Sequence, residues 1–329
     1  MVAFLSWPLV VLVVVVMMMV LAGPTSCGAA GIASDQATDA TKVFYNRVPK
    51  AASTALRSII SDLARHKRNL KFVSSKVYDD RKRWSREEER ANAERINFVF
   101  ETNFDQHVIY DQHVRYINFT QFGLQQPVYI NMVREPAARI VSSYYFARTG
   151  DSSKREQVRR KLGEQADWSV DECLAHGDNC TFARNMGGNL MTKFFCGHAD
   201  VCNRVGPAAL EQALYNLEHN YAVVGITERF DDTLALLEAT LPHIFRGAVR
   251  LRERHGIKKS NRNTRAGPTP NAETIAAIRH SARYDVALYD RAVDLFERRL
   301  RKAQQQQQQQ QQEQPLKRPS RPRDYDDDD

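Results

Sequence analysis

The chain has 329 residues, with 47 Lys plus Arg against 39 Asp plus Glu and a formal net charge of +8. This length suits one sizeable α/β domain or two small ones. The positive charge narrows the partners to polyanions such as nucleic acid, an anionic membrane or a sulfated glycan.

The chain begins with an uncharged apolar segment. Residues 1–34 carry no charge, and the apolar run 4–22 has the length of a signal-peptide core or a short membrane-spanning helix. The small residues after Leu21 favour a cleaved signal peptide, whereas the length of the run favours an uncleaved type II anchor. Either way, residues 1–23 are predicted to direct the chain into the secretory pathway. Residues 24–41 are predicted to form a stem.

Two sequons for N-linked glycosylation agree with a luminal location. They begin at Asn118, in Asn-Phe-Thr, and at Asn179, in Asn-Cys-Thr. A lumen excludes most nucleic-acid partners. The polyanion favoured by the net charge is therefore predicted to be a glycan.

Four cysteines form two close pairs along the chain, Cys173 with Cys180 and Cys196 with Cys202. In an oxidising lumen such spacings favour two local disulfides, although four cysteines allow three connectivities. A zinc site is the alternative, but its ligands more often come as Cys-x-x-Cys pairs, and neither pair has that spacing. We therefore expect disulfides and no metal.

The folded unit is predicted to span residues 42–302. Within it, short β-rich runs alternate with helical periodicity, which is typical of βα units and predicts an α/β fold with a mostly parallel sheet. Residues 67–95 are very polar and indicate an exposed helix or a mobile insert. The glutamine run 304–312 and the charged segments after it cannot pack a core, so residues 303–329 are predicted to be disordered.

Residues 43–66, VFYNRVPKAASTALRSIISDLARH, indicate a strand, a short loop and an amphipathic helix. The start of a helix offers unpaired backbone amides and the positive end of its dipole, and Lys50, Ser53 and Thr54 add donors. The combination predicts a phosphate site, although the glycine pattern of a P-loop is absent. The alternative is a plain strand-to-helix turn capped by Ser53.

A second strand-to-helix junction follows the predicted strand VYINMV. Arg134 stands at the end of that strand, and Ser142 lies about two helical turns further on. Open α/β sheets bind ligands at the carboxyl ends of their strands. Lys50 and Arg134 are therefore predicted to converge on one ligand with two separated phosphate-like groups.

Several segments together resemble the uronyl 2-O-sulfotransferases: FYNRVPKAAST, YDQHVRYINF, PVYINMVREPAARIVSSYYFAR, FFCGH and VGITERFDD. This family includes heparan sulfate 2-O-sulfotransferase, its dermatan/chondroitin relative and the insect pipe-type enzymes. The resemblance covers about residues 43–300. It implies a Golgi enzyme with a P-loop-like α/β fold that uses 3′-phosphoadenosine 5′-phosphosulfate, PAPS, as sulfuryl donor without a metal.

The resemblance also implies roles in donor binding. Lys50, Ser53 and Thr54 match the positions that hold the 5′-phosphosulfate, and Arg134 and Ser142 match those for the 3′-phosphate. A segment that resembles one closing over the nucleotide contains Lys259, Ser260 and Thr264.

On the acceptor side, His113 falls where the family has its catalytic base. A neutral histidine can take the proton of the attacking hydroxyl, while Lys50 stabilises the leaving oxygen. Arg47 and Arg159 match positions associated with the acidic glycan. Asp111 stands where the heparan enzymes have a histidine, and it is predicted to face the acceptor side, orienting His113 or contacting water. The alternative for His113 is a structural hydrogen bond.

Three function classes follow from these residues. The preferred one is an active polysaccharide sulfotransferase. A glycan-binding pseudoenzyme is the alternative, favoured by Asp111 and by Ala51, where the heparan enzymes typically have threonine. A nucleotide-dependent kinase is disfavoured, because a glycine-rich loop and Mg²⁺ carboxylates are absent.

The family resemblance also implies a homo-oligomer, since the heparan member is trimeric. The predicted C-terminal helix has an apolar stripe through Val286, Tyr289, Val293 and Phe296, broadened by Leu288 and Leu295. Such a stripe more often belongs to the core than to an interface.

Overall fold

The structure is a computed structural model that describes residues 41–78, 83–149, 155–182, 188–254 and 267–313. The predicted targeting segment and nearly all of the predicted stem lie outside these residues, and so do Lys259, Ser260 and Thr264. Across the described ranges, no helix combines the length and the apolarity needed to span a membrane.

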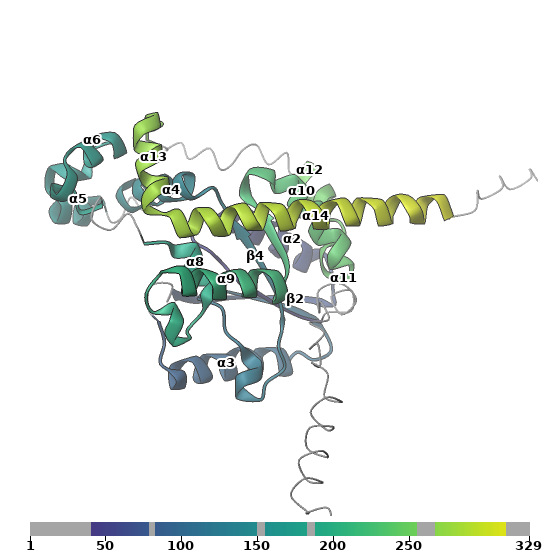
Figure 1. The fold of residues 1–329 in the computed structure, drawn as a ribbon. Coiled ribbons are helices and arrows are strands. Elements are labelled where there is room, and N and C mark those ends of the chain that lie inside the picture. Colours follow the sequence, from purple (N-terminus) through teal and green to yellow (C-terminus); the bar gives the residue numbers. More distant parts are fainter. Residues whose placement is uncertain (1–40, 79–82, 150–154, 183–187, 255–266, 314–329) are drawn as a thin grey trace, which may run out of the picture. The chain divides into compact units, whose positions relative to one another are not determined.

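A five-stranded sheet forms the centre of the fold (Figure 1). Its strands are β1 (Lys42–Asn46), β2 (Leu70–Tyr78), β3 (His107–His113), β4 (Val128–Val133) and β5 (Tyr221–Ile226). Their spatial order is β2-β3-β1-β4-β5, and every neighbouring pair is parallel. The α/β class predicted from the sequence is confirmed.

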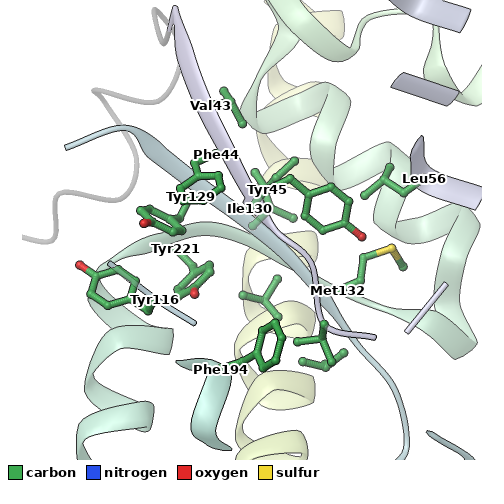
Figure 2. Packing of buried hydrophobic residues seen from close by; sticks show 14 of the residues in the cluster. Val43, Phe44, Tyr45, Leu56, Tyr116, Tyr129, Ile130, Met132, Phe194 and Tyr221 are labelled. Carbon is green, nitrogen blue, oxygen red and sulfur yellow. The ribbon is translucent and has the colours of Figure 1, made fainter. Parts of the chain in front are cut away.

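The central strands are apolar because both of their faces are covered. Phe44, Tyr129 and Tyr221 pack together on one face, with ring centres 5.1 Å apart for the first pair and 5.3 Å for the second. Tyr45 lies on the opposite face, toward Leu56 (Figure 2). Strands buried on both faces read as continuous apolar runs rather than as an alternating pattern, as β1 and β4 do.

Helices and short 3-10 turns connect the strands. The helix α2 (Ser53–His66) follows β1 and packs against β2. The other α-helices are α3 (Arg86–Glu101), α4 (Pro136–Thr149), α5 (Arg155–Leu162), α6 (Val170–Ala175), α8 (Leu190–Cys196), α9 (Pro207–His219), α10 (Phe230–Thr240), α11 (Pro242–Phe245), α12 (Ala248–Arg254), α13 (Ala272–Ser281) and α14 (Arg283–Glu313). The 3-10 turns lie at Phe119–Phe122, Gly163–Ala166, Gly177–Asn179, Asp200–Cys202 and Thr227–Arg229.

The polar segment 67–95 was predicted as an exposed helix or insert, and the structure corrects half of this. Its first part is the strand β2, which pairs only with β3 at the edge of the sheet. An edge strand is free to carry polar residues, so its composition hid it. The second part begins the helix α3, where Ser85 and Glu88 form a capping box.

The last helix runs beyond the expected boundary of the folded unit. The helix α14 continues through the glutamine run to Glu313, whereas disorder was predicted from residue 303. Once a helix is nucleated, each further residue adds a hydrogen bond, and glutamine is a good helix former. The buried stripe of α14 consists of Leu288, Ala292, Phe296 and Leu300. Of the predicted apolar residues, Leu288 and Phe296 are therefore buried in the core, and Tyr289, Val293 and Leu295 are partly buried against it.

Both predicted disulfides are present. Cys173 bonds to Cys180 and Cys196 bonds to Cys202, with Cα–Cα distances of 5.3 and 5.7 Å. Each bridge closes a short local loop, the first after α6 and the second after α8. Because all four thiols are engaged in bridges, the alternative of a cysteine zinc site is excluded.

Close packing between β5 and α10 predicts a cost for any side chain at Gly225. A Cβ there would overlap the methyl group of Thr233. Thr233 is held in place by accepting a hydrogen bond from the Ile226 amide at 3.1 Å. We expect Gly225→Ala to lower the free energy of unfolding by about 1–3 kcal/mol in urea titrations. Equal stability of the variant and the parent would contradict this packing.

The matched control adds Thr233→Ser, which removes the overlapping methyl group. Relative to Thr233→Ser alone, the double variant is expected to lose less stability than Gly225→Ala loses relative to the parent.

Candidate active site

The loops that follow β1, β3 and β4 meet at the carboxyl edge of the sheet. In the sheet β1 lies between β3 and β4, so the chain crosses from one side of β1 to the other between these two strands. Such a switch point is where open α/β sheets bind ligands. The residues after the three strands begin with Arg47, Val114 and Arg134, and His113 ends β3.

The loop between β1 and α2 achieves its turn without glycine. Lys50 has φ 65° and Ala52 has φ 54°, so both adopt the left-handed conformation that normally favours glycine. Each such residue costs about 1 kcal/mol or more. The surrounding packing maintains this conformation: Ala51 between them is fully buried in the core.

The first turn of α2 is uncapped. Ala52 occupies the N-cap position and has no side-chain acceptor for the following amides. Ser53 is the first helical residue, so the alternative of a turn capped by Ser53 is wrong. Ser53 is buried and Thr54 is exposed. Uncapped amides together with the helix dipole favour an anion at this position.

The two predicted cations do converge. Arg134 Nη1 donates to the backbone carbonyl of Lys50 at 3.4 Å. Burial, and secondly the charge of Arg134, lower the pKa of Lys50. The ammonium group lies 3.8 Å from the ring centre of Phe146. Two neighbouring cations at an uncapped helix start favour an anionic ligand, because it relieves their mutual repulsion.

The predicted base, His113, is held by the loop that carries Lys50. Its Nδ1 lies 2.8 Å from the carbonyl oxygen of Arg47. The register of β1 with β3 places the two residues side by side, because Asn46 pairs with Gln112. Burial, followed by the charge of Arg47, lowers the pKa of His113 to about 4. The ring is thus neutral at pH 7, with its proton on Nδ1 and its lone pair on Nε2.

Asp111 has a different position from the predicted one. Its side chain is fully buried, so it does not contact water or an acceptor. Asp111 Oδ2 lies 3.2 Å from Arg47 Nε and 2.7 Å from Arg57 Nε. Ser74 Oγ donates to Oδ1 at 2.6 Å. Burial raises the pKa of this carboxyl, and the charges of Arg47 and Arg57 oppose the rise.

The two arginines predicted at the glycan differ in exposure. Arg47 is only 3% exposed and is paired with Asp111, so it faces the protein interior rather than an acceptor. Arg159 lies on the exposed side of α5, 3.0 Å from Asp167. Ser142 is half-buried on α4. The proposed contacts of Arg159 with the glycan and of Ser142 with the donor stay predictions.

Both sequons are accessible. Asn118 and Asn179 are exposed, and Asn118 Oδ1 accepts a hydrogen bond from the Thr120 amide at 3.2 Å.

Throughout the described ranges, no group of His, Cys, Asp and Glu has the arrangement of a metal site.

The chain is similar to proteins of known function. A family described as "Sulfotransferase family" matches residues 37–298. Heparan sulfate 2-O-sulfotransferase 1 of Gallus gallus is 35% identical over 274 residues, covering 81% of this chain and 73% of that protein. The Homo sapiens protein of that name is 35% identical over 263 residues, 78% and 70% of the two chains. Heparan sulfate 2-O-sulfotransferase hst-2 of Caenorhabditis elegans is 31% identical over 272 residues, 81% of each.

The chain belongs to the uronyl 2-O-sulfotransferase family. It is therefore a sulfotransferase enzyme, and the resemblance predicted from the sequence is confirmed. The parallel sheet with its surrounding helices is consistent with the sulfotransferase fold that the resemblance implies.

Three further residues contact the predicted site residues and were not predicted from the sequence. Arg57 lies on α2, seven positions after Lys50. The helical periodicity of that segment does not indicate that this arginine pairs with a buried carboxylate. Ser74 lies in the strand that was not recognised. Phe146 belongs to the aromatic run of α4, but only the structure shows that it contacts the ammonium of Lys50.

The buried carboxylate predicts a large effect of Asp111→Asn on stability. This change leaves the guanidinium groups of Arg47 and Arg57 without their counter-charge. We expect a loss of about 3 kcal/mol in the free energy of unfolding, measured by urea titration. Asp167→Asn breaks the exposed pair with Arg159, and this control should lose about 0.5 kcal/mol or less. Similar losses in both variants would contradict the assigned role of Asp111.

Proposed function

We propose that the enzyme transfers a sulfuryl group from PAPS to the 2-hydroxyl of a uronic acid in a glycosaminoglycan, with His113 as general base. The observation that carries this proposal is the 2.8 Å hydrogen bond between His113 and the carbonyl of Arg47. It ties the candidate base to the same loop that presents Lys50. This bond supports the proposal because it links the backbone of the loop that carries the candidate cation to the candidate base.

The donor site rests on the fit between the residues and the anionic groups of PAPS. The uncapped amides of α2, the ammonium of Lys50 and the hydroxyls of Ser53 and Thr54 suit the 5′-phosphosulfate. Arg134, which reaches the same loop, suits a second phosphate, with Ser142 further along α4. Ala51 faces the core, so a hydroxyl at that position would not add directly to this exposed surface.

The proposed reaction needs a base that removes one proton and a cation that stabilises one developing negative charge. As the acceptor oxygen bonds to sulfur and the sulfur–phosphate oxygen bond breaks, His113 Nε2 takes the hydroxyl proton. The proton on Nδ1 stays there and is donated to the carbonyl oxygen of Arg47, which keeps the ring oriented and strengthens Nε2 as an acceptor. Lys50 stabilises the negative charge that develops on the leaving oxygen.

The acceptor is proposed from the relatives and from the charge of the chain. The relatives named above are heparan sulfate 2-O-sulfotransferases, and a net charge of +8 suits a polyanionic glycan. Arg159 is our candidate for a contact with it. Dermatan and chondroitin sulfate belong to the same substrate class, so the panel of acceptors to be tested contains desulfated forms of all three glycosaminoglycans.

We also propose a place and an assembly for the enzyme. Residues 1–23 would anchor it in the Golgi membrane as a single-pass type II protein, or would be removed as a signal peptide to release it into the lumen. Mass spectrometry of the mature N-terminus separates the two.

A homo-trimer is proposed by family resemblance, and light scattering that gives a monomer at assay concentration would exclude an obligate trimer.

Turnover should depend on both His113 and Lys50. We expect the purified protein to label desulfated glycosaminoglycans with sulfate from PAPS at uronyl O-2, as identified by disaccharide analysis. His113→Ala should reduce kcat about 10²–10⁴-fold, and Lys50→Ala about 10²–10³-fold. His219→Ala, at a half-buried histidine at the end of α9, is the control and should keep full activity.

Donor-product binding separates this proposal from a pseudoenzyme. His113→Ala should still bind 3′-phosphoadenosine 5′-phosphate in calorimetry, because the base does not hold the donor. A folded parent protein that binds this nucleotide and labels no glycan in the panel would favour the pseudoenzyme.

The low pKa of His113 predicts how activity depends on pH. The base is active when neutral, and the pKa of His113 lies at about 4, below the ordinary 6.5. The kcat/KM of the free enzyme should therefore stay level from pH 7 down to about 5.5 and fall only near pH 4. A half-loss of activity near pH 6.5 would contradict a buried base.

Melting curves at each pH are the control for that profile. In the unfolded state the histidine takes up a proton below its pKa of about 6.5, whereas in the folded state it stays neutral down to its lower pKa. The free energy of unfolding therefore falls as the pH drops from about 6.5 toward the folded pKa. Only pH values at which the protein remains folded enter the profile.

A further inference from the structure

A second group of cations lies beside the proposed base, outside the donor loop. Arg115 follows His113 by two residues, so their Cα atoms are at most ~7 Å apart. Its side chain is buried, with 4% exposed. The amide of the next residue, Tyr116, donates to the carbonyl of Phe194 at 2.7 Å. This bond places Arg115 alongside the end of α8, where Lys193 precedes Phe194.

A glycine brings a histidine against the same segment. Gly197 has φ +99°, and a Cβ there would lie 2.8 Å from the carbonyl oxygen of Tyr116. Only glycine lets the chain after α8 approach this backbone so closely. The next residue, His198, is 4% exposed, and its ring stacks on Trp84 with centres 4.7 Å apart.

The hydrogen bond on one side of the His198 ring determines what the other side can do. The Trp84 amide donates to His198 Nδ1 at 3.0 Å. In the neutral ring the proton must then be on Nε2, which makes Nε2 a donor. Nε2 is buried and has no hydrogen-bond partner among the described residues. A buried donor without an acceptor is costly, and native proteins rarely leave one unexplained.

The charges around this donor favour an anion. Burial, then Arg115 and Arg83, lower the pKa of His198 to about 3, and Glu88 opposes them weakly. The ring is therefore a neutral donor in a positive field. Arg83 lies next to His198, because its Nη1 donates to the His198 carbonyl at 3.0 Å, and the same atom lies 2.9 Å from Asp200 Oδ1.

Lys193 adds to the same field. Burial and then Arg115 lower the pKa of Lys193, whereas Asp285 raises it. Asp285 already accepts from the Thr192 amide at 2.8 Å and lies 3.7 Å from Arg139, so it is engaged elsewhere. Lys193 itself is half-buried rather than enclosed in the core.

We propose that His198 Nε2, Arg115 and Lys193 form a subsite for an oxyanion of the glycan acceptor, adjacent along the polymer to the reacting hydroxyl. The oxyanion is a sulfate ester or a uronate carboxylate. This proposal rests on the proposed function and adds the acceptor contact that Arg47 does not provide, because Asp111 already neutralises Arg47. The subsite makes the enzyme selective for acceptors with an anion at that position.

The test compares acceptors and variants. Lys193→Gln and Arg115→Gln remove one charge each. The control Lys71→Gln removes an exposed charge near the start of β2, at the amino-terminal ends of the parallel strands and away from their carboxyl ends. KM and kcat are measured with one sulfated glycosaminoglycan, its desulfated form and its carboxyl-reduced form. Both subsite variants should raise KM about tenfold for acceptors that retain the recognised anion, with kcat and the KM for PAPS nearly unchanged. Lys71→Gln should match the parent.

The two modified acceptors identify the anion. If it is a sulfate ester, desulfation should remove the difference between the variants and the parent, and carboxyl reduction should preserve it. If it is a carboxylate, the opposite pattern is expected. Equal KM values for the parent and Lys193→Gln on all three acceptors would overturn the proposal.

Direct binding separates this inference from the proposed function. Calorimetry with a sulfated oligosaccharide, in the presence of 3′-phosphoadenosine 5′-phosphate, tests the subsite without turnover. Weaker binding by Lys193→Gln supports the subsite even if no glycan is sulfated, whereas unchanged binding overturns it. Because Arg115 is buried, melting curves check its variant, and the half-buried Lys193 decides the outcome if Arg115→Gln fails to fold.

Discussion

The buried carboxylate of Asp111 fixes the geometry on which the active-site edge depends. It joins residues from three separate elements: Arg47 after β1, Ser74 in β2 and Arg57 in α2. A buried carboxylate is tolerable only when it is paired and hydrogen-bonded, so these elements cannot shift independently. Because the backbone of Arg47 also accepts the hydrogen bond from His113, the ion pair indirectly sets the position of the proposed base.

The donor loop shows how this rigidity supports a strained conformation. Left-handed Lys50 and Ala52 cost free energy that a glycine would spare, and they persist because the loop is anchored at its start and in its middle. Arg47 anchors its start, and buried Ala51 anchors its middle. The benefit of using lysine rather than glycine is a cation presented directly by the turn. A phosphate cradle without the glycine pattern is therefore physically reasonable.

The sequence predicted those parts of the site that follow from strand order. Lys50 and Arg134 each lie between a strand and the following helix. Parallel strands bring such junctions to one edge of the sheet. The direction of side chains was not predictable: Arg47 was expected at the glycan, but the structure turns it toward Asp111, a partner whose burial no local pattern reveals. The strand β2 was missed for a related reason, because an edge strand lacks the apolar run by which central strands are recognised.

Two buried histidines show how one residue type takes opposite chemical roles at this edge. Burial and neighbouring arginines lower the pKa of both His113 and His198, so both stay neutral. Nδ1 of His113 faces a carbonyl and must donate, which leaves Nε2 as a proton acceptor. Nδ1 of His198 accepts from the Trp84 amide, which makes Nε2 a donor. The backbone partner of Nδ1 thus suits the first ring to act as a base and the second to hold an anion.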